Sequence, residues 1–126
     1  MVRWQTGAVA ARAIALTRSD GTSVCEGCRV AESFGSRLRG LLGASSLATG
    51  SGMLFPGTRS VHTHFMRFPV DVVFLDGENR IVSIAPELRP WRSAASRRAR
   101  SVLELAAGEC ERLGLAEGAT LVEAVR

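Results

Sequence analysis

Two histidines and a methionine fall at alternate positions near the middle of the chain, at His62, His64 and Met66. If this segment is extended, the three side chains share a face, because successive residues of a strand alternate between faces. Imidazole and thioether donors suit a soft ion such as Cu(I), but the spacing fits no standard zinc motif. We therefore assign no metal here, and ordinary packing and an organic-ligand site both stay open.

A carboxylate interrupts the apolar segment PVDVVF at Asp71. A buried carboxylate must be paired, hydrogen-bonded or protonated, since an isolated buried charge costs several kcal/mol. Arg59, Arg67 or a histidine could serve as its partner. Two roles stay open for Asp71: it pins a turn or an arginine, or it acts as a base beside His62.

The first two cysteines, Cys25 and Cys28, form a CxxC motif, and Cys110 is left without a partner by count. Together with His62 and His64, the motif would formally complete a Cys2His2 zinc site. A single CxxC without a second pair nearby is weak evidence for zinc. We favour reduced thiols, with a redox pair or a zinc site as the alternatives, and the cofactor stays unknown.

Every basic residue is an arginine, and sixteen of them against twelve acidic residues give a net charge of +4. Five arginines crowd the connection between residues 87 and 100, around Trp91. Arginine beside an aromatic ring can hold phosphates and stack on a base. The net charge is modest and no recognition motif is present, so we expect a solvated basic loop and no nucleic-acid partner.

Short strands and turns dominate the pattern. A hairpin is expected at residues 13–25, because Asp20-Gly21 favours a tight turn between two β-prone segments. A helix is expected from Ser33 to Gly43, where leucines recur at helical spacing. Further strands are predicted at 52–55, 60–66, 70–75, 80–84, 101–105 and 120–125, with a hairpin turn at 76–79, a long connection at 87–100 and a second helix at 108–113.

This order predicts a single α+β domain over residues 1–126, mainly an antiparallel or barrel-like sheet with two short helices. No apolar run approaches the roughly 20 residues that span a bilayer, and the N-terminal segment lacks the apolar run of a signal peptide. We therefore expect a cytoplasmic protein without a membrane partner.

Five segments, in this order along the chain, resemble the family known as domain of unknown function 192: SRLRGLLG, GMLF, SVHTHFMRFPVDVVFLD, LRPW and ARSVLELAAGECERLGL. The resemblance covers about residues 30–122, with the hairpin at 13–25 before this core. It implies a compact, mostly β domain with short helices, found in bacteria and archaea, without an established biochemical activity. The recurring motif residues of the family fall here on Arg37, Gly40, Met53, His62, Met66, Pro69, Asp71, Leu75, Glu104 and Gly108.

The favoured hypothesis is a small binding module that accepts a small polar or anionic ligand in a pocket around residues 62–66. Its predicted ligand-binding residues are Arg37, His62, Met66, Asp71 and Trp91. One alternative is an enzyme that uses His62 and Asp71 as an acid–base pair. The other is a protein-interaction domain whose arginine-rich connection at 89–100 meets an acidic partner.

Overall fold

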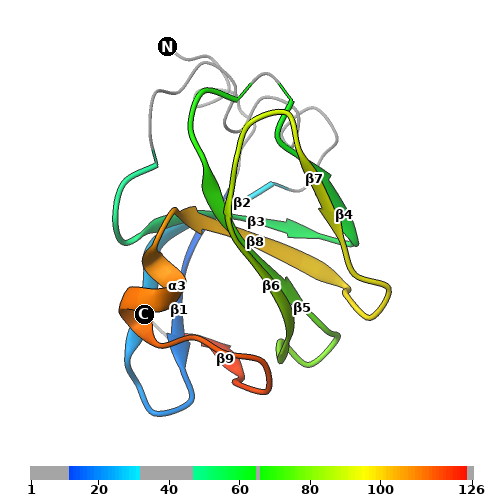
Figure 1. Ribbon diagram of the computed structural model, residues 1–126. Helices are drawn as coiled ribbons and strands as arrows, with labels where there is room; N and C mark the ends of the chain where they lie inside the picture. The colour runs from blue at the N-terminus through cyan, green and yellow to red at the C-terminus, as the bar shows by residue number, and fades with distance from the viewer. Residues whose placement is uncertain (1–11, 32–46, 65, 125–126) are drawn as a thin grey trace.

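A curled sheet makes up most of the structure (Figure 1). The computed structural model describes residues 12–31, 47–64 and 66–124. Seven strands lie in the order β6-β5-β8-β3-β2-β1-β9, and a separate two-stranded ribbon, the β4–β7 ribbon, pairs β4 with β7. The elements are β1 (Ala13–Arg18), β2 (Ser23–Val30), β3 (Ser51–Pro56), β4 (Ser60–His62), β5 (Val70–Leu75), β6 (Ile81–Leu88), β7 (Ser93–Ala95), β8 (Ser101–Ala106), α3 (Glu109–Leu113) and β9 (Leu121–Glu123).

Aspartate side chains shape the turns of two hairpins. In the β1–β2 turn, the N–H of Thr22 donates to Asp20 Oδ1 at 2.9 Å. In the β5–β6 turn, Asp76 Oδ1 accepts the N–H groups of Glu78 at 2.8 Å and Arg80 at 3.0 Å. A carboxylate that captures nearby amides fixes a turn locally, which is why aspartate is common there. Both predicted hairpins are confirmed.

The sheet curls until its two edge strands approach each other (Figure 1). Arg80 and Thr120 form an antiparallel bridge between the start of β6 and the start of β9. Next to it, the N–H of Ile81 donates to the carbonyl of Ala119 at 2.8 Å. Neighbouring strands run antiparallel except β2 and β3, which are parallel. The result is a half-barrel whose interior is filled by side chains.

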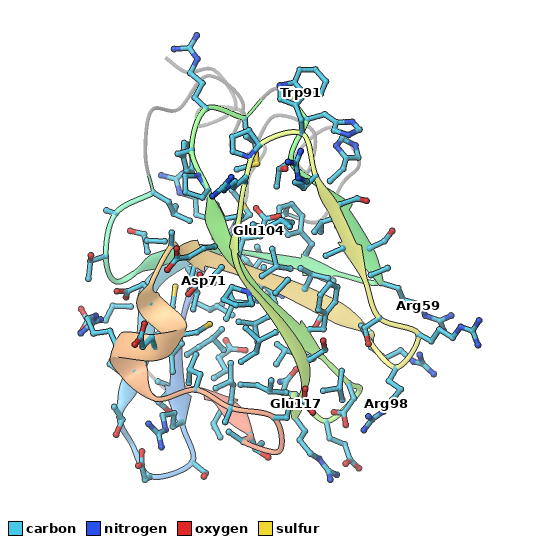
Figure 2. All side chains as sticks on the ribbon, viewed as in Figure 1. Arg59, Asp71, Trp91, Arg98, Glu104 and Glu117 are labelled. Carbon is cyan, nitrogen blue, oxygen red and sulfur yellow. The ribbon has the colours of Figure 1, made fainter. Side chains whose placement is uncertain are left out.

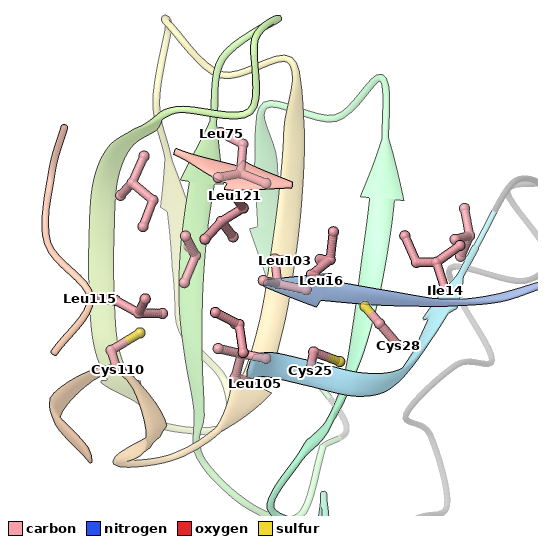
Figure 3. Packing of buried hydrophobic residues seen from close by; sticks show 14 residues of the cluster. Ile14, Leu16, Cys25, Cys28, Leu75, Leu103, Leu105, Cys110, Leu115 and Leu121 are labelled. Carbon is pink, nitrogen blue, oxygen red and sulfur yellow. The ribbon is translucent and has the colours of Figure 1, made fainter. Parts of the chain in front are cut away.

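Each face of the sheet buries its own apolar cluster. The interior cluster lies inside the curl and is shown in Figure 3; the outer cluster lies between the sheet and the β4–β7 ribbon with its adjoining loops. Strand β5 serves both, because Val73 and Leu75 face the interior while Val72 and Phe74 face outward. This double burial explains why the β5 sequence is a nearly continuous apolar run.

A β-bulge in β2 turns both cysteines of the CxxC motif to the interior. Ile14 pairs with Cys28 and Leu16 pairs with Cys25, so a step of two residues on β1 faces a step of three on β2. Both thiols are buried and free. Contact with Cys25, together with burial, raises the pKa of the Cys28 thiol. The pair therefore packs as small apolar side chains.

Three predictions about the elements need correction. The described residues are mostly β with one short helix, α3, in place of an α+β domain with two helices, and the helix predicted at 33–43 lies outside the described residues. The strand predicted at 60–66 ends at His62, because the chain turns at Thr63. The connection at 87–100 contains β7, which pairs with β4.

No described helix is long and apolar enough to cross a membrane.

Candidate functional site

Three aromatic rings stack at one end of the β4–β7 ribbon. The ring centroids of His62 and His64 are 4.5 Å apart with an interplanar angle of 29°, and those of His64 and Trp91 are 5.1 Å apart at 26°. Both separations fall within the range of attractive aromatic pairs. Trp91 is 55% exposed and lies at the top of Figure 2, so the stack is at the protein surface.

Thr63 holds the segment that carries Trp91 against β4. The N–H of Thr63 donates to the carbonyl of Arg92 at 2.8 Å, and the N–H of Trp91 donates to the carbonyl of Thr63 at 3.1 Å. The Thr63 hydroxyl accepts the N–H of Arg92 at 2.9 Å and donates to the carbonyl of Arg89 at 2.5 Å. Because Thr63 is 0% exposed, water does not compete for these bonds, and they position the rings on either side of it.

The backbone at Trp91 is in the left-handed region, with φ of 64°. A bulky residue adopts this conformation only where contacts with the surrounding structure hold it there. Such positions cluster at functional sites. Here the hydrogen bonds of Thr63 to Trp91 and Arg92 supply that constraint. The ring of Trp91 therefore reaches the stack from a strained backbone conformation.

Seven exposed arginines lie in the segments that flank β4 and β7 along the chain. They are Arg59, Arg67, Arg89, Arg92, Arg97, Arg98 and Arg100. In the part of the chain that the structure describes, the ion pairs involve other arginines, namely Arg18, Arg80 and Arg112. The ribbon and its loops therefore present positive charge to solvent.

Of the five predicted ligand-binding residues, His62 and Trp91 lie in the ring stack. Met66 and Asp71 lie elsewhere in the fold, and Arg37 is not among the described residues. His62 and Trp91 are the two ends of the stack, bridged by His64. Met66 is 8% exposed and packs in the outer cluster. Asp71 lies on the interior face of β5, on the other side of the sheet (Figure 2). Arg37 lies outside the described residues.

Asp71 binds two backbone amides inside the fold. It is 1% exposed, and its carboxylate accepts the N–H of Glu87 at 2.8 Å and the N–H of Cys110 at 2.8 Å. Glu87 forms the bulge of β6 with φ of 49°, and Cys110 lies in the first turn of α3, whose N-cap residue Gly108 has no side-chain cap. Asp71 therefore ties the bulge to the helix, and the acid–base pair with His62 is not formed.

The proposed metal ligands are also separated. Cys25 and Cys28 point into the interior cluster (Figure 3), whereas His62 and His64 lie on the ribbon and its following turn. No cluster of three or more His, Cys, Asp or Glu side chains suited to a metal ion occurs among the described residues. Burial and the nearby Asp71 raise the pKa of Cys110 to about 12, so this thiol stays protonated and is a poor ligand or nucleophile.

The burial of Glu104 was not predicted from the sequence, where Glu104 was named only as a recurring motif residue of the family. Strand β8 places it between Met53 of β3 and Val72 of β5, on the face of the outer cluster. It is 3% exposed, and burial raises its pKa to about 7; no hydrogen bond or ion pair to its carboxylate occurs within the described residues. The sequence did contain a sign of this burial: Glu104 interrupts the apolar segment SVLELA in the same way that Asp71 interrupts the apolar segment of β5. A carboxyl in such a setting can take up or release a proton near neutral pH.

A comparison with protein families identifies the domain. The family model of domain of unknown function 192 (DUF192), described as "Uncharacterized ACR", matches residues 15–122. The chain belongs to the DUF192 family. The resemblance stated from the five sequence segments is thereby confirmed, and the matched range contains the ring stack, Asp71 and Glu104. No curated protein matches this DUF192 chain.

Two solved structures resemble this DUF192 fold. One, from Sinorhizobium meliloti 1021 and described as "a putative transcription regulator", is 26% identical with a TM-score of 0.78, over 90% of this chain and 94% of that one. The other, a protein of unknown function from Novosphingobium aromaticivorans DSM 12444, is 22% identical with a TM-score of 0.74, over 89% of this chain and 84% of that one. The second likeness shows the fold alone.

Proposed function

We propose that this DUF192 protein is a binding module for a small planar anion, and that the ring stack of His62, His64 and Trp91 is its site. The observation that carries the proposal is the stack itself, because both of its end residues, His62 and Trp91, are exposed. A planar ligand can continue such a stack, since π faces attract one another in offset arrangements.

The charge around the stack supports an anionic ligand. Arg89 and Arg92 lie on either side of Trp91 in the chain, and all three are exposed. The bonds of Thr63 to the Arg89 carbonyl and to the Arg92 backbone fix the turn that carries them. A guanidinium group binds a phosphate or a carboxylate through two parallel hydrogen bonds. A ring that bears a phosphate, such as a mononucleotide, therefore fits this site best.

The ligand-binding set differs from the one expected from the sequence. Met66 supports the ribbon from the outer cluster, against which Val61 of β4 also packs. Asp71 contributes to the scaffold through its two amide contacts. Arg37 stays a predicted member of the set, and the expected cytoplasmic location is part of the same proposal.

Isothermal titration calorimetry with three probes tests the proposal. Adenosine 5′-monophosphate has both ring and phosphate, adenosine has only the ring, and ribose 5-phosphate has only the phosphate. We expect the monophosphate to bind most tightly, and His62→Ala and Arg92→Gln each to weaken it roughly tenfold. Arg80→Gln, which removes an ion-paired arginine away from the stack, serves as the matched control. Equal affinity for the monophosphate and for ribose 5-phosphate would show that the ring stack does not contribute to binding.

The exposed arginines of the 89–100 connection favour a second candidate, an interaction domain for an acidic protein partner. Such a partner would need the charges but not the rings. Binding of poly-glutamate that His64→Ala leaves unchanged would support this candidate over the first.

A further inference from the structure

The outward face of the β4–β7 ribbon carries small side chains next to the ring stack. The register pairs Ser60 with Ala95 and His62 with Ser93, and all four residues are exposed. Val61 and Ala94, which alternate with them, pack against the outer cluster instead. Apart from the ring of His62, only short side chains project from this face, and Ser60 and Ser93 provide two hydroxyl groups. An extended chain can therefore lie along it.

Arginines gather at the far end of this face. The N–H of Ser96 donates to the carbonyl of Arg59 at 2.9 Å, which brings the start of β4 beside the turn that carries Arg97 and Arg98. Figure 2 shows Arg59 and Arg98 at the same corner of the molecule. The three arginines are exposed and take part in no ion pair among the described residues. The Asp76 carboxylate accepts the amides of Arg80 and Glu78 in its own turn; these bonds lower its pKa most, and the charge of Arg98 adds to them.

We infer that the β4–β7 ribbon binds single-stranded nucleic acid, with a base on the ring stack and phosphates on the arginines at both ends. This inference rests on the proposed function, because the mononucleotide site supplies the base contact. A single strand offers free base faces for stacking, whereas a duplex keeps most of them inside its own stack. An acidic peptide would match the charge but would leave the three stacked rings without a role.

The local sequence pattern did not predict this partner. Arg59 and Arg97 are far apart in the chain, and neither neighbours an aromatic residue. The antiparallel pairing of β4 with β7 brings both to one end of the ribbon, while Thr63 brings Trp91 to the other end. Folding thus places the arginines at the far end of the ribbon on the same surface as the rings.

Fluorescence anisotropy of a labelled oligothymidylate of about 12 nucleotides tests the inference, because this length lies within the range that one single-strand-binding domain covers. The variant Arg97→Gln with Arg98→Gln removes two charges from the ribbon. The matched control, Arg80→Gln with Arg112→Gln, removes the same charge from ion-paired positions off the ribbon. Titration of adenosine 5′-monophosphate into the same variants follows the mononucleotide site separately.

We expect the ribbon variant to bind the oligonucleotide roughly tenfold more weakly and with a smaller dependence on salt, since fewer counterions are released. Its binding of the monophosphate, and the oligonucleotide binding of the control, should equal those of the wild type. If the wild type binds the monophosphate but the two arginines have no effect on the oligonucleotide, the inference is wrong and the proposed function stands. If a duplex or poly-glutamate competes as well as the single strand, the inference is also wrong. Failure of the monophosphate to bind contradicts the proposed function itself.

Discussion

Thr63 and Arg92 exchange hydrogen bonds in both directions: the N–H of Thr63 donates to the Arg92 carbonyl, and the N–H of Arg92 donates to the Thr63 hydroxyl. The two residues are 29 positions apart, and the contact is buried on the Thr63 side. This contact joins the turn after β4 to the turn before β7. The placement of Trp91 on the histidine rings depends on it.

Replacement of Thr63 by valine should lower the free energy of unfolding by about 2 kcal/mol. Valine has nearly the same shape as threonine but lacks the hydroxyl, so the Arg92 N–H and the Arg89 carbonyl lose their hydrogen-bond partner. Monophosphate binding should weaken as the stack loosens. Urea unfolding measures the first effect and calorimetry the second. Thr63→Ser keeps the hydroxyl and should stay close to the wild type; a valine variant with unchanged stability and binding would refute this role of Thr63.

Replacement of Asp71 by asparagine should lower the free energy of unfolding by about 2–3 kcal/mol, since an amide side chain has one acceptor oxygen for two N–H donors. Ligand binding should be unaffected, because Asp71 lies across the sheet from the stack. Asp20→Asn is the matched control: Asp20 is an exposed turn residue that accepts one amide, so its change should have little effect. If Asp71→Asn abolished binding without loss of stability, Asp71 would belong to the ligand site after all.

Glu104 should make the protein less stable as the pH rises. Its pKa in the folded state is about 7, against an ordinary value of 4.5, so between these values the folded state holds a proton that the unfolded state has released. The full difference corresponds to about 3 kcal/mol above pH 7. Glu104→Gln, which resembles the protonated form, should therefore be more stable than the wild type at about pH 8 and similar to it at about pH 4.

The difference between wild type and Glu104→Gln isolates this effect, because other groups titrate equally in both proteins. Glu109 acts in the opposite direction: Arg112 lowers its pKa, so its contribution to stability is lost as the pH falls. Urea unfolding of both proteins across the pH range is the measurement. A difference that did not change with pH would show that the pKa of Glu104 is the same in the folded and unfolded states, and would contradict the raised pKa.

Gly52 should not tolerate a side chain. A Cβ atom there would lie 2.9 Å from the Glu104 carbonyl oxygen, 2.9 Å from Leu105 Cδ2 and 3.1 Å from Cys25 Sγ. Overpacking of this kind costs about 1–3 kcal/mol. Gly27→Ala is the control, because nothing lies within 4 Å of its added Cβ. Thermal unfolding should show a lower Tm for Gly52→Ala only; equal values for the two variants would contradict the packing described for β3.

The sequence predicted those features that depend on near neighbours. The strand β5 was predicted from Val70 to Leu75 because an apolar run ends there at an aspartate turn, and the structure has these bounds. The charge of Asp71 was recognised as needing a partner, but the partners are backbone amides of β6 and α3 rather than an arginine. Local pattern could not supply them, because folding brings them to Asp71 from residues 16 and 39 positions away.

The candidate site was predicted only in part, for the same physical reason. His62 and Trp91 were each selected for their chemistry, yet their connection through His64 depends on the hydrogen bonds of Thr63. His64 itself was considered as a metal ligand or as part of a packed or ligand-binding face, but it was not among the predicted ligand-binding residues. The short strand β7 was missed because three small residues, Ser-Ala-Ala, carry no strong strand signal, and it forms by pairing with β4.

The ring stack is expected to bind a planar anion, and the fluorescence of Trp91 reports on this binding. Trp4→Phe leaves Trp91 as the only tryptophan of the chain, so the signal reports on the stack alone. Titration with adenosine 5′-monophosphate should quench this fluorescence in a saturable way, and His62→Ala should shift the midpoint roughly tenfold higher. Ribose 5-phosphate should leave the fluorescence unchanged. No saturable quenching by the monophosphate, or the same midpoint with and without the His62 ring, would show that the ring stack does not bind a planar anion.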